Sequence, residues 1–193
     1  MSGAERRAAI LTAAMRVFSA GSYASATTAA IAREAGITEP VLYHHFKGKA
    51  DLYSACLDLA WLEIHTRWEE ALDAEPDPAR WLPLMAVVGF AHDDEREGGR
   101  MWLHAITDIA DDPRARPRVV TFTRDLHEYI AGVLARAQEA GGVRAELDPR
   151  AEAWIFLGIG ALRALSRRLD GVADADFPSV LASRHAWYGL EGN

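Results

Sequence analysis

The segment TTAAIAREAGITEPVLYHHFKGKADL, residues 27–52, constrains the fold more than any other part of the chain. Its first residues predict a short helix over about 28–35, because threonine is a favoured N-cap. Gly36 then supplies a tight turn, since glycine adopts left-handed backbone angles at little cost. A second short helix is predicted over about 38–45, with Pro40 in its first turn, where a missing amide proton costs nothing. The segment therefore predicts two short helices joined by a glycine turn.

A further helix is predicted before this segment, over about 4–20, because its apolar residues recur at the three-and-four spacing of one helix face. The two short helices carry apolar residues spaced to pack them together, namely Ile31, Ala32, Ala35, Ile37, Leu42 and Phe46. Three helices with a tight turn between the second and third form the helix-turn-helix pattern, whose third helix enters the major groove of DNA. Residues 1–48 are therefore predicted to form a DNA-binding domain.

The charge distribution supports this division of the chain. The protein carries a net charge of -7, yet residues 1–50 carry +3, so the remainder carries -10. Overall acidity argues against bulk, non-specific binding of nucleic acid, while a basic first quarter suggests a separate function for that part. The only two lysines, Lys47 and Lys49, follow the third predicted helix, where cations can reach DNA phosphates.

The same segment resembles the N-terminal domain of the tetracycline-repressor (TetR) family of bacterial transcription regulators. The family pattern is I-A-x-x-A-G-V-[ST] followed by L-Y-x-[HY]-F-x-x-K-x-x-L, and the resemblance covers about residues 10–53. The matching residues are Ile31, Ala32, Ala35, Gly36, Ile37, Thr38, Leu42, Tyr43, His45, Phe46, Lys49 and Leu52. The resemblance implies that Thr28, Tyr43, His45 and Lys49 contact the DNA backbone, and that Thr38, Glu39, Val41 and His44 lie near base edges.

Two features depart from the family pattern. Ala29 and Ala30 stand where relatives often have polar or basic residues, so the second helix offers fewer contacts to DNA. Glu39 brings a negative charge toward DNA, and it either accepts a hydrogen bond from a cytosine amino group or points to solvent. We therefore expect modest affinity per subunit and a strong dependence on dimerisation.

In the rest of the chain, residues 49–193, the sequence pattern predicts helices separated by glycine and proline. Alternating strand patterns are almost absent. The predicted helices cover about 49–73, 78–94, 100–110, 116–140, 149–169 and 176–190, and Asp148 before Pro149 marks a helix start. The expected fold class is all-α, with about nine helices. The resemblance implies that residues 49–193 form a ligand-binding and dimerisation domain.

Aromatic and histidine side chains of this second region are candidates for a pocket that binds a small, largely apolar or aromatic molecule. They are Trp61, His65, Trp68, Trp81, His92, Trp102 and His104. The alternative is that the tryptophans are core residues and the histidines are exposed or already hydrogen-bonded. The pairs His65/Glu69 and His104/Asp108 have i, i+4 spacing, but such pairs are more often surface hydrogen bonds than metal sites. Neither a metal nor a cofactor is predicted.

The predicted helix over 149–169 has a broad apolar surface, formed by Trp154, Phe156, Leu157, Ile159, Leu162 and Leu165. With the last helix it would form a two-helix face, and the resemblance implies that this face pairs with its copy in a homodimer. The alternative is burial inside one subunit. Gly158 and Gly160 lie within this helix, where glycine lowers helix stability, so close packing would have to compensate.

No catalytic motif such as G-x-S-x-G, a phosphate-binding P-loop or H-E-x-x-H occurs, so the chain is not predicted to be an enzyme. The single cysteine, the absence of a signal-peptide pattern and the absence of a long apolar run favour a cytoplasmic protein without membrane contact. The prediction is a homodimeric repressor that a small effector releases from a palindromic operator. An activator with the same DNA mechanism is one alternative. A helical small-molecule-binding protein or enzyme with a purely structural N-terminal region is another.

Overall fold

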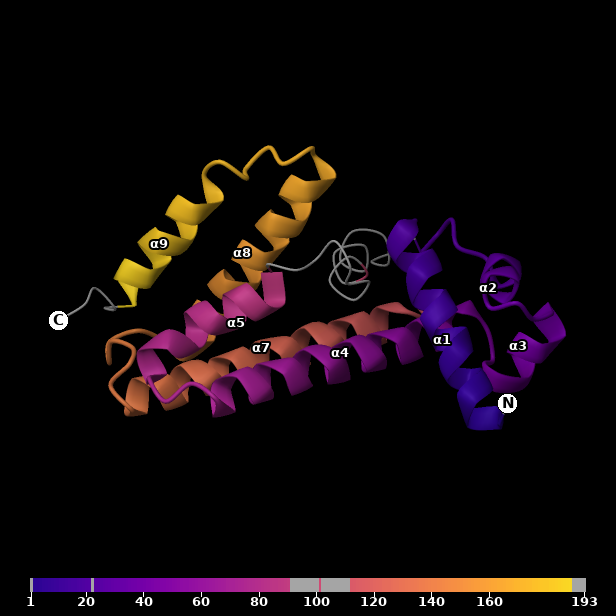
Figure 1. The fold of residues 1–193 in the computed structure, drawn as a ribbon, viewed down its shortest axis with the longest axis horizontal. Coiled ribbons are helices and arrows are strands. Elements are labelled where there is room, and N and C mark those ends of the chain that lie inside the picture. The colour runs from indigo at the N-terminus through magenta and orange to yellow at the C-terminus, as the bar shows by residue number, and fades with distance from the viewer. Residues whose placement is uncertain (1, 22, 91–100, 102–111, 189–193) are drawn as a thin grey trace. The chain divides into compact units, whose positions relative to one another are not determined.

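The computed structural model describes residues 2–21, 23–90, 101 and 112–188, and over these residues the chain forms helices and no strand. The predicted all-α fold class is confirmed (Figure 1). The elements are α1 (Gly3–Ala20), α2 (Thr28–Glu34), α3 (Glu39–His45), α4 (Lys49–Asp73), the 3-10 helix η1 (Pro78–Arg80), α5 (Trp81–Phe90), α7 (Arg116–Glu139), α8 (Pro149–Arg168) and α9 (Phe177–Trp187). No helix among the described residues is both long and apolar enough to cross a membrane.

Helix boundaries agree with the sequence prediction to within a few residues, with one difference in helix type. The helix predicted over 78–94 starts as the 3-10 turn η1, in which the Arg80 amide donates to the Asp77 carbonyl three residues earlier at 3.0 Å. The Asp77 carboxylate also accepts a hydrogen bond from the Ala79 amide at 3.0 Å. Apart from Met101, which is helical, the helix predicted over 100–110 lies outside the described residues.

The chain packs as two units, one formed by residues 1–63 and 95–123 and the other by residues 64–94 and 124–193. α4 and α7 each contribute to both units. In the first unit α1 packs on α2, and α2 packs on α3. Its buried core includes Ile10, Leu11, Ala14, Phe18, Ile31, Ala32, Leu42, Phe46, Leu52, Tyr53 and Leu57.

Three aromatic rings join α1, the loop after it and α4 within the first unit. The rings of Phe18 and Tyr23 both meet the buried Tyr53 ring edge to face, at centroid distances of 4.9 and 5.1 Å. The Tyr23 hydroxyl hydrogen-bonds Asp112, just before α7. Burial, and then this carboxylate, raise the pKa of Tyr23 to about 12. The cluster therefore ties α1, the loop after it and α4 to the segment just before α7.

In the second unit the core surrounds Trp68 of α4. The Trp68 indole donates a hydrogen bond to the Met85 carbonyl of α5 at 3.0 Å, and its ring stacks on Tyr129 of α7 at 5.6 Å. α5 also packs on α8. Other buried residues are Leu72, Leu82, Leu126, Ile130, Val133, Leu134, Ala137, Ala153, Phe156, Leu157 and Phe177.

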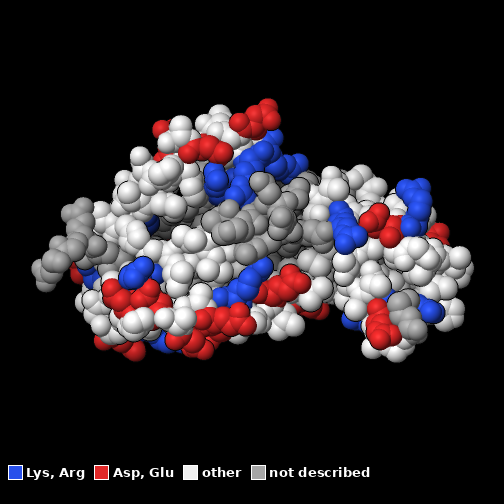
Figure 2. All heavy atoms as spheres, viewed as in Figure 1, with Lys and Arg blue, Asp and Glu red and all other residues white. Residues whose placement is uncertain are grey.

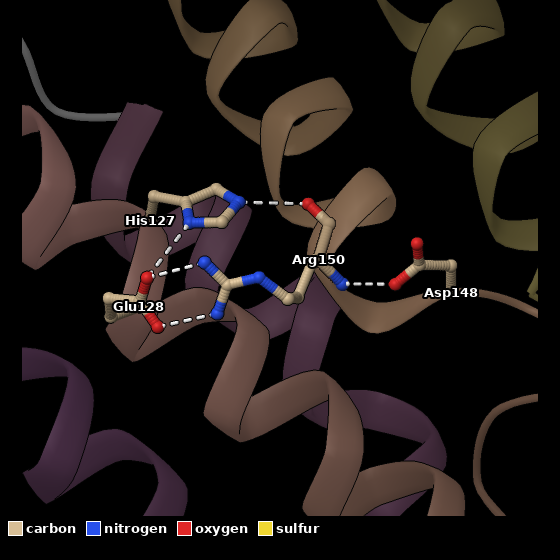
Figure 3. Close-up of polar contacts among 4 residues, drawn as sticks. All are labelled: His127, Glu128, Asp148 and Arg150. Carbon is tan, nitrogen blue, oxygen red and sulfur yellow. Dashed lines mark hydrogen bonds and ion pairs between the residues drawn. The ribbon is translucent and has the colours of Figure 1, made fainter.

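The first turn of α8 is fixed to α7 by polar contacts (Figure 3). The Asp148 carboxylate accepts a hydrogen bond from the Arg150 amide at 2.9 Å, which confirms the predicted helix start. The Arg150 guanidinium binds both oxygens of Glu128, at 2.6 and 2.7 Å. His127 is buried, and its Nε2 lies 2.9 Å from the Arg150 carbonyl, which can only accept. The orientation of α8 is thereby set at its N-terminus.

Candidate nucleic-acid interface

The turn between α2 and α3 has the geometry predicted for a helix-turn-helix unit. Gly36 has φ 66, in the left-handed region that favours glycine. Its amide donates to the Arg33 carbonyl at 3.1 Å, and the Ile37 amide donates to the Ala32 carbonyl at 2.9 Å. These two hydrogen bonds close the C-terminus of α2 and redirect the chain into α3.

α3 buries its predicted inward residue Leu42, and it exposes some of the residues predicted to face outward. Leu42 and, just after the helix, Phe46 are buried against the first unit. Thr38, Tyr43 and His44 are exposed, and the Tyr43 side chain is 50% accessible to solvent. The three other outward residues of the prediction, Glu39, Val41 and His45, are half-buried.

A hydrogen bond to the backbone determines which ring nitrogen of His44 carries a proton. Its Nδ1 lies 2.7 Å from the Pro40 carbonyl, and because a carbonyl can only accept, Nδ1 carries the proton. In the neutral ring Nε2 is then a hydrogen-bond acceptor. An acceptor on an exposed face of α3 can pair with the amino group that adenine or cytosine presents in the major groove.

Two hydroxyl groups and a carboxylate form a chain between α2 and α3. The Thr28 hydroxyl donates to Glu39 Oε1 at 2.5 Å, and the Tyr43 hydroxyl lies 3.2 Å from Thr28 Oγ1. Since the Thr28 hydroxyl has one proton, which Glu39 accepts, Tyr43 is the donor in the second bond. Glu39 therefore has a partner inside the protein, which neither sequence interpretation of this residue anticipated.

Lys49 is engaged within the protein. Its ammonium group donates to the carbonyls of Tyr23, Ala26 and Ala24 at 2.8, 3.1 and 3.4 Å, and it lies 4.4 Å from the centre of the Tyr23 ring. A lysine has three donors, so a phosphate would compete with these carbonyls. The Lys47 side chain is exposed, while its amide donates to the Asp51 carboxylate in the first turn of α4 at 2.8 Å.

The two lysines should therefore respond differently to substitution. Lys49→Ala is expected to lower the free energy of unfolding by about 2 kcal/mol, the scale of hydrogen bonds from a charged group. Lys47→Ala should leave stability unchanged, and it should weaken DNA binding across sequences while reducing the salt slope by about one. Urea unfolding and DNA titrations at several salt concentrations measure both effects. A stable Lys49→Ala protein with a reduced salt slope would instead make Lys49 a phosphate contact.

Charges of both signs occur on α1, α2 and α3. On the face drawn in Figure 2, these helices show a few basic and acidic groups side by side and mostly uncharged surface. Arg16 of α1 and Glu34 of α2 are 3.6 Å apart and form one such mixed pair.

The predicted ligand-binding residues are spread over both packing units. Trp61 is half-buried in the first unit. In the second unit Trp68 is buried, and the half-buried Trp81 donates from its indole to the Glu75 carbonyl at 2.9 Å. His65 meets the Tyr129 ring edge to face at 4.8 Å. The other three candidates, His92, Trp102 and His104, lie outside the described residues.

Tyr129 is a residue of this region that sequence reasoning missed. Its ring contacts both His65 and Trp68, and its hydroxyl donates to Glu69 Oε1 at 2.5 Å. Burial, and then the Glu69 carboxylate, raise the pKa of Tyr129. The structure thus brings two of the predicted ligand-binding residues together around one phenol. Within the described part of the chain, no three histidine, cysteine or acidic side chains gather as metal ligands.

The model of the bacterial regulatory proteins of the tetR family matches residues 10–56, which contain most of α1, all of α2 and α3, and the start of α4. The HTH-type transcriptional regulator TtgR of Pseudomonas putida is 33% identical over 150 residues, which cover 75% of this chain and 71% of TtgR. The chain belongs to the TetR family. This membership confirms the resemblance drawn from the sequence and makes the protein a DNA-binding transcriptional regulator.

Solved structures of TetR-family proteins share the fold. A TetR-family regulator from Agrobacterium tumefaciens superposes with a TM-score of 0.83 at 22% identity, over 96% of this chain and 98% of its own. AibR in complex with isovaleryl coenzyme A and operator DNA has a TM-score of 0.65 at 20% identity, over 81% of this chain and 84% of its own. At these identities the likeness establishes the fold alone.

Proposed function

We propose that this TetR-family protein is a cytoplasmic, homodimeric repressor that places α3 of each subunit in the major groove of one half of a palindromic operator. The observation that carries the proposal is the outward, polar face of α3, with Thr38, Tyr43 and His44 exposed above the buried Leu42. Residues 1–48 are the proposed DNA-binding domain, and residues 49–193 serve ligand binding and dimerisation. No enzymatic activity is proposed.

We assign the dimer interface to α8 and α9. Phe156 and Leu157 of α8 are buried within the subunit, whereas other large apolar side chains of the same helix and its C-terminal end are exposed: Trp154, Ile155, Leu162, Leu165 and Leu169. α8 therefore has an outer apolar face as well as an inner one. Among the described residues, no atom outside the backbone of α8 itself lies within 4 Å of a Cβ added at Gly158, so none of them packs closely enough there to offset the cost of this helical glycine. Close packing of a second subunit on this face would offset it.

A small, largely apolar or aromatic effector is proposed to bind near His65, Trp68 and Tyr129. Aromatic walls with a polar pair, here the Tyr129 hydroxyl and the Glu69 carboxylate, suit such a molecule. The fold relative AibR, whose structure contains isovaleryl coenzyme A and operator DNA, supports the combination of ligand and DNA binding.

The two functions are coupled through α4 in this proposal. α4 contributes to both packing units, so a ligand that shifts its distal half also acts on the segment that follows α3. If the ligand binds more tightly to a conformation that holds the two α3 helices at the wrong spacing, the DNA-bound population falls.

Selection of binding sites from random duplex DNA, followed by salt titration of the selected duplex, tests this function. We expect a palindromic sequence whose affinity falls steeply with salt, because each half-site adds phosphate contacts. No enriched sequence, together with a shallow salt response, would contradict the proposal. It would favour the alternative in which the N-terminal helices are only structural.

A further inference from the structure

We propose that Glu39 is an internal competitor of DNA phosphate, which withholds the hydroxyl donors of Thr28 and Tyr43 from the DNA backbone. This inference rests on the proposed function, because it concerns how tightly the same face binds the DNA backbone. Glu39 would then lower the affinity for DNA without contacting a base.

The hydrogen-bond chain provides the first step. Tyr43 donates to Thr28, and Thr28 donates to the Glu39 carboxylate at 2.5 Å, so both hydroxyl protons are used inside the protein. These hydroxyls stand where the family pattern predicts contacts to phosphate. A phosphate oxygen is a charged acceptor of the same kind as a carboxylate oxygen. For the Thr28 hydroxyl, binding a phosphate therefore exchanges one charged acceptor for another, and the net gain is small.

The position of Glu39 provides the second step. It is half-buried in the first turn of α3, so its charge stays on the face that would approach DNA. Lys49, which resembles a phosphate-binding residue of the family, donates its ammonium protons to backbone carbonyls of the 23–26 loop. The backbone contacts of Thr28, Tyr43 and Lys49 are then weaker than the family pattern implies, and base contacts supply a larger share of the binding free energy.

A double-mutant cycle between Glu39→Ala and Thr28→Val tests the competition directly. The probes are two labelled duplexes, one of mixed sequence and one selected by the wild-type protein, titrated at fixed salt. Glu39→Ala is expected to tighten binding to both duplexes by about tenfold, the effect of one hydrogen bond to a charged group. Thr28→Val should weaken binding less than about twofold in the wild type but about fivefold in Glu39→Ala, because the Thr28 hydroxyl is then available to phosphate.

Two further variants separate competition from simple charge repulsion. Glu34→Ala removes one negative charge from the exposed end of α2, so repulsion alone would predict the same gain in affinity as Glu39→Ala. We expect a much smaller gain. Glu39→Gln keeps an acceptor for Thr28 without the charge, and it should give an affinity between those of the wild type and Glu39→Ala. If Glu39→Ala melts at a lower temperature than the wild type, Glu39→Gln replaces it in the double-mutant cycle.

Additive effects of Glu39→Ala and Thr28→Val would overturn the proposal, as would equal gains from Glu34→Ala and Glu39→Ala. If Glu39→Ala weakened binding to the selected duplex and not to the mixed one, the proposal would also be overturned. Glu39 would then contact a base. Failure of the wild-type protein to bind either duplex would be a different result. It would refute the proposed DNA-binding function, and this inference with it.

Discussion

Replacing Leu165 with glutamate is expected to produce a folded monomer that binds the operator about 100-fold more weakly or worse, since an unpaired charge buried in an interface costs several kcal/mol. The Leu165 side chain is 48% exposed in the isolated subunit, so the substitution should leave the fold of that subunit intact. A palindrome is bound by two linked reading helices, and loss of the dimer removes half of the contacts. Light scattering gives the mass, and a mobility shift gives the affinity.

Val87→Glu is the matched control for this experiment. Val87 lies on α5 in the same packing unit and is 52% exposed, but it is not part of the outer face of α8. The control protein should remain dimeric and should bind DNA as the wild type does. If Leu165→Glu also stayed dimeric, the outer face of α8 would not be the dimer interface.

The second large effect is expected at the ion pair between Glu152 of α8 and Arg184 of α9. Glu152 is only 6% exposed, and the Arg184 guanidinium that binds it also lies over the rings of Trp187 and Tyr188, at 5.5 and 5.2 Å. Glu152→Ala leaves a buried guanidinium without its carboxylate, and should lower the free energy of unfolding by about 3–5 kcal/mol. Urea unfolding of the subunit or dimer measures the loss.

Two comparisons decide whether the cause is the unpaired charge. The double variant Glu152→Leu/Arg184→Met removes both charges and should recover most of the stability, because apolar replacements of a buried pair are often neutral. Glu128→Ala breaks the exposed pair with Arg150 and should have a far smaller effect. If Glu152→Ala were as stable as the wild type, α9 would not depend on this pair.

The helices could be predicted from the sequence because their signals are local. Thr27 accepts a hydrogen bond from the Ala30 amide at 3.1 Å and caps α2, as its residue type predicts. Gly36 adopts the left-handed conformation that the turn requires. The spacing of apolar residues likewise identified the inward side of α3, where Leu42 is buried.

The polar partners of the candidate site could not be predicted, because they depend on contacts between residues that are distant in sequence. Lys49 has the residue type and position of a phosphate contact, but the carbonyls of the 23–26 loop converge on it only in the folded chain. From the sequence, Glu39 is expected to face solvent or to contact a base. Its hydrogen bond with Thr28 forms only when folding places α2 beside α3. Tyr129 carried no sequence signal, since its role comes from contacts with α4.

Whether α3 reads the operator is tested most directly by repeating the selection from random duplex DNA with His44→Ala. The His44 imidazole is exposed and presents Nε2 as an acceptor when the ring is neutral. The variant should select the same palindrome, with its base preference reduced about tenfold at one symmetric pair of positions and unchanged elsewhere. Base preferences identical to those of the wild type at every position would contradict a reading role for this face of α3.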